Sequence, residues 1–242
     1  MPTEADQRQK RTIRALFTGI ATHYDQVNRI LSLGRDQSWR RLALKMAEVP
    51  AGGRLLDVAA GTGDMALLAL QHETPIRVVA TDLTPAMLYQ ARAKARSTAI
   101  ERLPLTVSDG LALAFADNSF DAVTSAFMMR NVPDVRQAFA EQARVVRPGG
   151  SVVCLEMTWP RRFPMRWLFA LYFFVVPPLL GRLMTGQREA YAYLPRSVKA
   201  FQDPESLAEK MGQSGLQAIS WKPLMGGTVV VHKGIKAGSD EI

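Results

Sequence analysis

Hydrophobic residues recur along this chain with two different periods, and the period changes near residue 50. Before that point, apolar side chains follow the helical spacing i, i+3, i+4, i+7 at Ile13, Leu16, Phe17 and Ile20. After it, short apolar runs bounded by glycine and proline alternate with stretches of helical periodicity. Strands that alternate with helices indicate a parallel sheet covered on both faces, so the pattern predicts an α/β fold.

The boundaries of the predicted elements follow from turn and capping residues. The helix through Trp39 and Met46 is expected to end before Pro50, and another helix is expected to begin at Thr84-Pro85. A turn is predicted at residues 147–150, where proline is followed by two glycines. Strands are predicted at residues 54–59, 76–82, 103–107, 120–127 and 151–155, further helices at 65–71, 135–146 and 204–211, and two antiparallel closing strands at 216–221 and 228–232.

Composition narrows the class of protein. Hydrophobic residues make up 48% and charged residues 21% of the 242 positions, which excludes disordered, collagen-like and purely coiled-coil chains. The single cysteine, Cys154, excludes an internal disulfide and suits a reducing compartment. Because His23, His72 and His232 lack the spacing of metal ligands, we expect no metal site. The start of the chain lacks an apolar signal region, so a cytoplasmic protein is expected.

The net charge of +8 is distributed unevenly along the chain. Residues 1–50 carry a net charge of +4 and residues 161–199 a net charge of +6, whereas residues 51–160 carry −1. Uniform basicity would favour nucleic acid, which we therefore do not expect as a partner. Two separate basic regions, one of them beside an apolar run, fit an anionic membrane surface and predict peripheral association with it.

The apolar run covers residues 167–181 and contains no charged side chain. It is shorter than the roughly 20 residues that span a bilayer, and Pro177-Pro178 interrupts it, so a membrane-spanning helix is not predicted. The run can lie in the membrane interface, or it can pack in the core or between two copies of the chain. The membrane interpretation assigns lipid contacts to Arg161, Arg162, Arg166, Trp167 and Phe173.

The candidate chemistry is concentrated in a glycine-rich turn, DVAAGTGD at residues 57–64, between a predicted strand and a helix. Glycines at such a turn let a ligand lie against backbone amides at a helix N-terminus. Gly61-x-Gly63-x-x-Ala66 satisfies the dinucleotide-binding pattern, and Asp82 lies 19 residues beyond Gly63, where a ribose-binding acid is expected. The turn alone therefore fits a nicotinamide or flavin site and an S-adenosylmethionine site equally well.

Further acidic residues favour the second kind of site. Asp57 ends a strand four residues before the glycines, where a carboxylate can organise the loop or meet a cationic ligand. Asp109-Gly110 follows the third strand, where an adenine amino group can be recognised. A dehydrogenase catalytic set is not apparent, since Tyr89 and Tyr193 lack a lysine four residues on. The ordered combination resembles class I S-adenosylmethionine-dependent methyltransferases.

Longer motifs make the resemblance more specific. Residues 24–39, YDQVNRILSLGRDQSW, and residues 144–150, RVVRPGG, look like the two signatures of the menaquinone/ubiquinone biosynthesis C-methyltransferase family. The similarity extends over about residues 12–235. Further matching segments are residues 117–121, 130–132, 155–156, 190–197 and 226–234. The chain departs from the family pattern at Asp36, where the family usually has histidine, and at Ala126, where a serine is common at the cofactor site.

The resemblance implies a Rossmann-like α/β fold of the class I methyltransferases, with a mostly parallel sheet and an antiparallel closing strand. Residues 1–50 are expected to form an N-terminal helical lid, and residues 51–242 an S-adenosylmethionine-binding domain with a helical insertion at about 160–200. The expected cofactor-binding residues are Asp57, Gly61, Thr62, Gly63, Asp82, Leu83, Asp109, Gly110 and Ala126, and the expected catalytic residues are Tyr24, Arg130 and Asn131.

The implied reaction is methyl transfer from S-adenosylmethionine to a ring carbon of a polyprenylated quinol, with demethylmenaquinol as the first candidate. A hydroquinone carbon becomes nucleophilic when the ortho hydroxyl loses its proton. Arg130 is expected to stabilise the phenolate, Asn131 to orient the ring and Tyr24 to close over it, although a structural ion pair is the other interpretation of Arg130. The alternatives are methylation of a ubiquinone precursor or another small molecule, an NAD(P)-dependent oxidoreductase, and a non-catalytic nucleotide-binding module.

Overall fold

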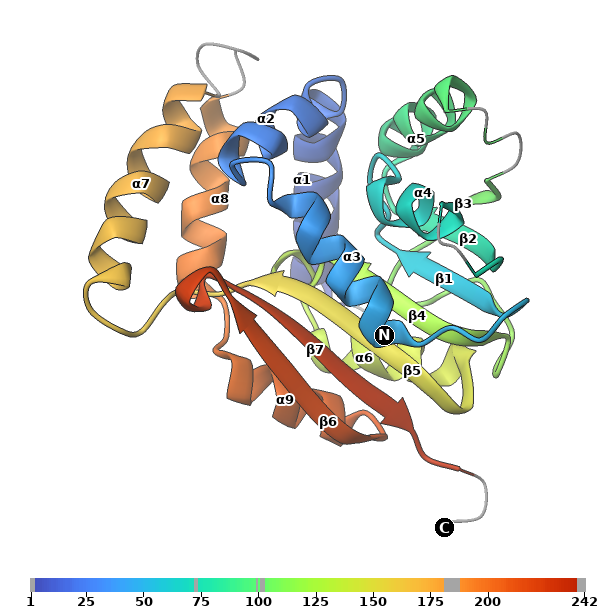
Figure 1. Cartoon of the computed structure of the whole chain (residues 1–242). Coiled ribbons are helices and arrows are strands. Elements are labelled where there is room, and N and C mark those ends of the chain that lie inside the picture. Colours follow the sequence, from blue (N-terminus) through green and yellow to red (C-terminus); the bar gives the residue numbers. More distant parts are fainter. Residues whose placement is uncertain (1–2, 72–73, 99, 101–102, 181–187, 239–242) are drawn as a thin grey trace.

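A computed structural model describes residues 3–71, 74–98, 100, 103–180 and 188–238 of the chain. Its centre is a seven-stranded sheet with the order β3-β2-β1-β4-β5-β7-β6 (Figure 1). Strands β1 to β5 run parallel to one another, and β7 runs antiparallel to both β5 and β6. The strands are β1 (Arg54–Val58), β2 (Arg77–Asp82), β3 (Leu105–Val107), β4 (Phe120–Ala126), β5 (Val146–Met157), β6 (Leu216–Leu224) and β7 (Val229–Lys236).

Helices cover both faces of the sheet, as the alternation of predicted strands and helices requires. Alternate residues of β1 point to opposite faces, so Leu56 packs with the core under α6 and α9 while Leu55 packs with the core under α3 and α4. The predicted α/β fold, mostly parallel with an antiparallel closing strand, is confirmed. The helices are α1 (Glu4–Ile20), α2 (Tyr24–Leu31), α3 (Asp36–Ala47), α4 (Asp64–Leu70), α5 (Pro85–Ser97), α6 (Val135–Val145), α7 (Met165–Leu180), α8 (Arg188–Ala200) and α9 (Pro204–Gln213), with short 3-10 helices η1 (Met129–Asn131) and η3 (Met225–Gly227).

The turn predicted at residues 147–150 is a bulge inside one long strand. Phe120 pairs with Val146 and Ala122 with Ser151, so the single residue Asp121 faces four residues of β5. Gly149 has φ +73°, in the left-handed region that favours glycine. The backbone therefore turns at the predicted glycine. Because β5 pairs with β4 both before and after residues 147–150, the strand continues through the turn as a bulge.

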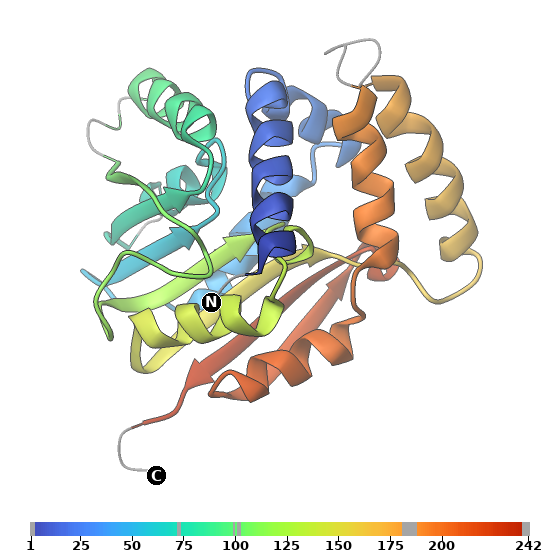
Figure 2. The same cartoon turned by 180° about the vertical axis from the view of Figure 1, so that it is seen from behind.

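The first three helices divide into two groups. Helix α3 lies against the sheet, where Ala43 and Ala47 join the core and the Ser151 hydroxyl donates to the Ala47 carbonyl at 2.6 Å. Helices α1 and α2 stand beyond the carboxyl ends of the parallel strands, and α1 contacts both α5 and α8 (Figures 1 and 2). The lid expected at residues 1–50 stays a prediction. Within that range, α3 packs against the sheet and is part of the core of the domain.

Helices α7 and α8 lie side by side next to α2, within the region expected as an insertion (Figure 2). Residues 181–187 of that region lie outside the described residues. Tyr172 of α7 donates its hydroxyl to the Leu31 carbonyl at 3.1 Å, which ties α7 to the end of α2. No helix among the described residues is long and apolar enough to cross a membrane. One assignment was wrong: Phe173 is 1% exposed, so it belongs to the interior and not to a lipid-contacting surface.

Candidate functional site

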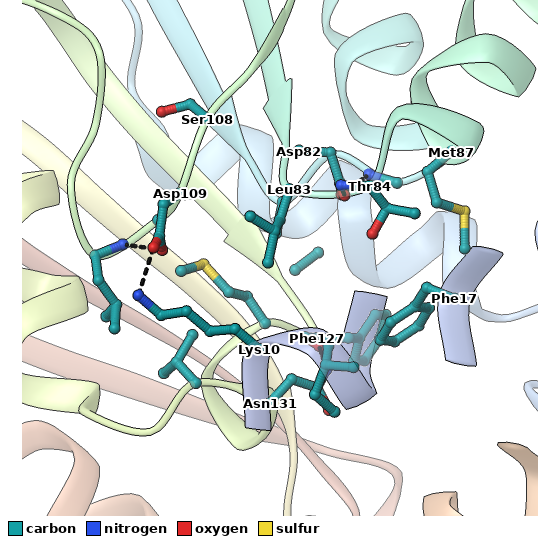
Figure 3. Close-up of a pocket in the computed structure, with 18 of the residues that line it drawn as sticks. Lys10, Phe17, Asp82, Leu83, Thr84, Met87, Ser108, Asp109, Phe127 and Asn131 are labelled. Atoms are coloured by element: carbon teal, nitrogen blue, oxygen red, sulfur yellow. Dashed lines mark hydrogen bonds and ion pairs between the residues drawn. The ribbon is translucent and has the colours of Figure 1, made fainter. Parts of the chain in front are cut away.

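Two adjoining cavities lie near the sheet, and the first opens where β1, β2 and β4 end. This is the carboxyl edge of the strands, where ligands of open α/β sheets bind. Helix α1 covers it from the opposite side with Lys10, Ile13 and Phe17 (Figure 3). Eight of the residues expected at the site line this cavity, although they come from five separate segments of the chain. They are Tyr24, Gly61, Asp82, Leu83, Asp109, Gly110, Ala126 and Asn131.

Asp82 is held in one orientation at the end of β2. Its two carboxylate oxygens accept hydrogen bonds from the backbone N–H of Gly61 at 2.9 Å and of Thr84 at 2.7 Å. Burial raises the pKa of Asp82, while those backbone donors oppose the rise. A carboxylate oxygen has more than one lone pair, so each oxygen keeps accepting capacity toward the cavity. A pair of adjacent hydroxyl groups, such as those of a ribose, suits this arrangement.

Asp109 lies on the opposite wall and is partnered by the N-terminal helix. The Lys10 ammonium approaches its carboxylate at 2.5 Å, and Asp109 also accepts from the Leu111 N–H at 2.9 Å (Figure 3). A Cβ at Gly110 beside it would meet the Met128 methyl carbon at 2.2 Å, so a side chain there would displace the end of Met128. Leu83 and Met128 line the same cavity as this carboxylate, and such a combination of apolar side chains with one polar group suits a ring such as adenine.

Three of the expected cofactor residues lie behind the cavity wall. Gly63 has φ +86° and precedes α4, where a Cβ would come within 3.1 Å of the Ala91 Cβ. The Thr62 hydroxyl donates to Asp25 of α2 at 2.5 Å and is thereby tied to the N-terminal helices. Asp57 is fully buried and accepts from the Thr124 hydroxyl at 3.2 Å. These residues shape the glycine turn, and a direct contact of any of them with a cofactor stays a prediction.

Burial raises the pKa of Asp57 to about 7, from an ordinary value of 3.8. Between these two values the folded protein keeps a proton that the unfolded chain releases, so the free energy of unfolding should fall as the pH rises through this range. The loss amounts to about 1.4 kcal/mol per pKa unit. We expect the melting temperature of the ligand-free protein to fall more between pH 5 and pH 8 than that of Asp57→Asn. Equal falls in thermal unfolding experiments would contradict the raised pKa.

The second cavity lies between α2, α3, α7 and the end of β4, and it adjoins the first at two shared residues. Tyr24 and Phe127 line both cavities, so a ligand in one faces a ligand in the other at this point. Phe127 has φ +58°, a strained conformation for an aromatic residue, directly after the last residue of β4. Burial raises the pKa of the Tyr24 hydroxyl, so Tyr24 is a hydrogen-bond donor at neutral pH.

Arg130 borders the second cavity from η1 and forms a buried ion pair with Glu156 at the end of β5. The side chain of Arg130 is 6% exposed and that of Glu156 is 0% exposed. Two guanidinium groups flank the Phe127 ring, since the Cζ atoms of Arg130 and Arg40 each lie 5.5 Å from its centroid. The Nε of Arg130 is buried without a hydrogen-bond partner. Arg130 therefore makes the structural ion pair and has one donor without a partner, and the catalytic role expected for it stays a prediction.

Asn131 lines the first cavity and is fixed there by two hydrogen bonds. Its Nδ2 donates to the Phe127 carbonyl at 3.0 Å, and its Oδ1 accepts from the Tyr193 hydroxyl of α8 at 3.1 Å. Sequence reasoning missed several other residues of the site, namely Lys10, Asp36, Arg40, Phe127 and Glu156. Phe127 carried a local signal, because it follows directly on a predicted strand that ends at the ligand-binding edge, and Asp36 carried one as a departure from the family pattern.

The sheet order, the glycine turn and the carboxylate after β2 define a class I methyltransferase fold. A solved S-adenosylmethionine-dependent methyltransferase from Thermotoga maritima shares it with a TM-score of 0.65 and 16% identity, over 92% of this chain and 99% of that one. The model of the ubiE/COQ5 methyltransferase family matches residues 3–236, and the chain belongs to this family. It is thus a methyltransferase that uses S-adenosylmethionine.

Relatives in this family are similar over their whole lengths. The demethylmenaquinone methyltransferase of Thermus thermophilus is 42% identical over 219 residues, which are 90% of this chain and 99% of that protein. The demethylmenaquinone methyltransferase of Bacteroides fragilis is 36% identical over 236 residues, 97% of this chain and 96% of that protein. The expected family resemblance and the methyltransferase class are confirmed, which decides against the alternative of an NAD(P)-dependent oxidoreductase.

Proposed function

We propose that the protein methylates a ring carbon of a polyprenylated quinol, with demethylmenaquinol as substrate. The observation that carries this proposal is the pair of cavities that meet at Tyr24 and Phe127. The first has acidic and backbone groups that suit the ribose and adenine of S-adenosylmethionine. The second combines aromatic and aliphatic side chains, such as Trp39 and Leu31, with the polar groups of Tyr24 and Arg130. An apolar ring that carries a hydroxyl group matches this lining.

S-adenosylmethionine supplies an electrophilic methyl group on a positively charged sulfur. In our proposal Asp82 holds the ribose hydroxyls, Asp109 faces the adenine and Gly61 allows close approach to the methionine part. Arg130 donates its unpartnered Nε–H to the quinol oxygen and stabilises the negative charge that develops there. Tyr24, at the junction of the cavities, and Asn131, which lines the first cavity, hold the ring so that its carbon lies in line with the methyl group.

The proposal is tested by incubating the protein with S-adenosylmethionine and each of two quinols. One is demethylmenaquinol and the other is the ubiquinone precursor that lacks the corresponding ring methyl group. We expect a product heavier by one methyl group from demethylmenaquinol, with S-adenosylhomocysteine formed in equal amount. Methylation of the ubiquinone precursor alone, or of neither quinol, would overturn the proposed substrate and leave the methyltransferase class unaffected.

We also propose that the exposed face of α7 contacts an anionic membrane, because an isoprenoid tail partitions into the bilayer. This face, which we call the α7 apolar face, consists of Trp167, Leu168, Leu171, Phe174, Val175 and Leu179, each between 46% and 73% exposed. A contiguous group of exposed apolar side chains on one helix marks an interaction surface. Arg162 and Arg166 beside it are exposed, and their charge suits lipid phosphates. Arg161 instead forms an ion pair with Asp203 at 2.7 Å.

The change of Trp167 and Leu171 to serine should weaken binding to anionic vesicles, since both side chains would otherwise dip into the interface. Flotation of wild type and variant with vesicles that contain phosphatidylglycerol measures this, and the bound fraction should fall further at high salt. The matched control is Tyr89→Ser on α5, where another exposed aromatic side chain lies outside the α7 apolar face. If the double variant floats like wild type but elutes as a smaller species in gel filtration, the face is a dimer interface.

A further inference from the structure

The polar wall of the second cavity contains a carboxylate whose role the proposed function leaves open. Asp36, the first residue of α3, lines this cavity together with Arg40 and, across it, Arg130. Its side chain is 4% exposed, so the carboxylate is buried in the wall. Among the described residues that line the second cavity, Asp36 is the one carboxylate, and no histidine or cysteine lines it.

The partners of Asp36 hold its carboxylate in place without saturating it. Oδ1 accepts from the Ser32 hydroxyl at 2.9 Å, and Oδ2 accepts from the Arg40 guanidinium at 2.7 Å. Two carboxylate oxygens offer about four lone-pair sites, so these bonds leave accepting capacity for a hydroxyl donor in the cavity. The Arg40 guanidinium in turn lies over Phe127, the residue at the junction with the first cavity. The carboxylate is thus linked by direct contacts to the place where the two ligands meet.

We propose that Asp36 is the catalytic base that accepts the proton of the quinol hydroxyl, a role that rests on the function proposed above. Proton acceptance requires a group that is unprotonated at neutral pH. A guanidinium group has donors and no acceptor atom, which leaves out Arg40 and Arg130, and burial raises the pKa of Tyr24, so none of these three can take the proton. Asn28 and Ser32, the other polar side chains of this wall, are not bases.

Asp25, the acidic residue next to Tyr24 in the sequence, is engaged elsewhere. Its carboxylate contacts the Lys94 ammonium at 2.5 Å and accepts from the Thr62 hydroxyl at 2.5 Å, behind the glycine turn. Glu156 contacts Arg130 from the side of β5, is fully buried and does not line the cavity. Elimination among the described carboxylates near the second cavity therefore leaves Asp36.

The step balances with Asp36 as acceptor. The hydroxyl O–H bond breaks, its electron pair stays on the ring oxygen, and the proton passes to the Asp36 carboxylate. The ring carbon ortho to that oxygen forms the new C–C bond while the C–S bond breaks, and the electron pair of that bond goes to sulfur. The same carbon then loses its hydrogen to water as a proton, and Asp36 returns its proton to the oxygen, which restores the aromatic quinol.

The charges around Asp36 suit the transfer of a proton from the quinol hydroxyl to its carboxylate. Arg29 from α2 lies 3.7 Å from Oδ1, and Arg40 from its own helix contacts Oδ2, so cations face it from two helices. Arg130 of η1 and the Tyr24 hydroxyl of α2 border the same cavity, and Arg40 also approaches Asp64 of α4 at 3.9 Å. When the carboxylate takes up the proton, the guanidinium groups face the phenolate instead, and the total charge of the cavity is unchanged.

The experiment measures turnover against pH for wild type and Asp36→Asn, with demethylmenaquinol saturating. General bases contribute about 10²- to 10⁴-fold, so we expect a loss of this size at neutral pH with unchanged affinity for S-adenosylhomocysteine. The residual rate of the variant should rise about tenfold per pH unit between about pH 7 and 9, because solvent then has to ionise the quinol. The wild-type rate should not show this rise. A merely structural role would lower the rate equally at every pH.

Two further variants keep the test decisive if Asp36→Asn folds poorly. Asp36→His should restore much of the turnover and lose it again below about pH 6.5, where an imidazole is protonated. Arg41→Gln, which changes an arginine of the same helix whose guanidinium contacts Gln37 at 3.4 Å, should keep the wild-type rate and pH profile. A wild-type rate in Asp36→Asn, or no acid limb in Asp36→His, would overturn the role of Asp36. Absence of quinol methylation by the wild type would instead overturn the proposed function.

Discussion

Replacement of Arg130 with lysine is expected to lower the turnover number about 10²- to 10³-fold, the usual cost of one preorganised donor to a developing oxyanion. Lysine can keep the ion pair with Glu156, because it carries the same charge on a chain of similar length. It has no counterpart of the Nε–H, which is buried without a hydrogen-bond partner. The melting temperature and the affinity for S-adenosylhomocysteine should therefore change little. Steady-state kinetics at saturating substrate measure the effect.

Alanine is a poorer replacement at this position. It would leave Glu156, which is 0% exposed, as an uncompensated buried charge, and breaking such a pair costs about 3–5 kcal/mol. The matched control is Arg144→Lys, since Arg144 makes ion pairs with Glu141 and Asp117 away from both cavities. That variant should lose stability and keep its turnover number. If Arg130→Lys turns over at the wild-type rate, Arg130 has only the structural role.

The second large effect is expected at the cofactor. Asp82→Ala removes charge-assisted hydrogen bonds to the ribose hydroxyls, worth about 1.5–3 kcal/mol, so the affinity for S-adenosylhomocysteine should fall roughly 10- to 150-fold. Isothermal titration calorimetry measures this directly, and the stabilisation of the protein by the ligand in thermal unfolding should shrink in parallel.

Asp203→Ala provides the comparison. Asp203 also accepts a backbone hydrogen bond, from Ser206 at 2.8 Å, but it caps α9 on the far side of the sheet. This variant should lose some stability through its cap and bind the ligand as wild type does. Unchanged affinity in Asp82→Ala would remove the ribose assignment, and the acidic residue of the glycine-turn pattern would then be structural.

The sequence predicted those parts of the site that depend on local backbone geometry. Gly61 and Asp82 lie at the ends of neighbouring parallel strands, and the carboxyl ends of such strands must meet at one edge of the sheet. Contacts between distant segments could not be predicted in this way. The Lys10–Asp109 ion pair and the approach of Arg40 to Phe127 join residues 99 and 87 positions apart, and only the packing of helices on the sheet brings them together.

The sequence also could not predict which side chains of α7 are exposed. The run at residues 167–181 is apolar throughout, so its sequence gives no period that separates buried from exposed positions. Packing against Phe169 and the second cavity buries Phe173, while Trp167 remains 73% exposed. Which aromatic residue faces outward depended on the orientation of the helix, and that orientation is set by tertiary contacts such as the one between Tyr172 and Leu31.

The two cavities are encoded by different stretches of the chain. The first is built largely on the loops after β1, β2, β3 and β4, whereas the second is walled mainly by α2, α3, α7 and α8, which precede and interrupt the sheet-forming core. Recognition of the methyl donor and choice of the acceptor can therefore change independently during evolution. Exchange of residues 24–47 and 160–200 between relatives with different acceptors would transfer the acceptor preference. The carboxyl edge of the sheet, which lines the first cavity, would remain that of the recipient protein.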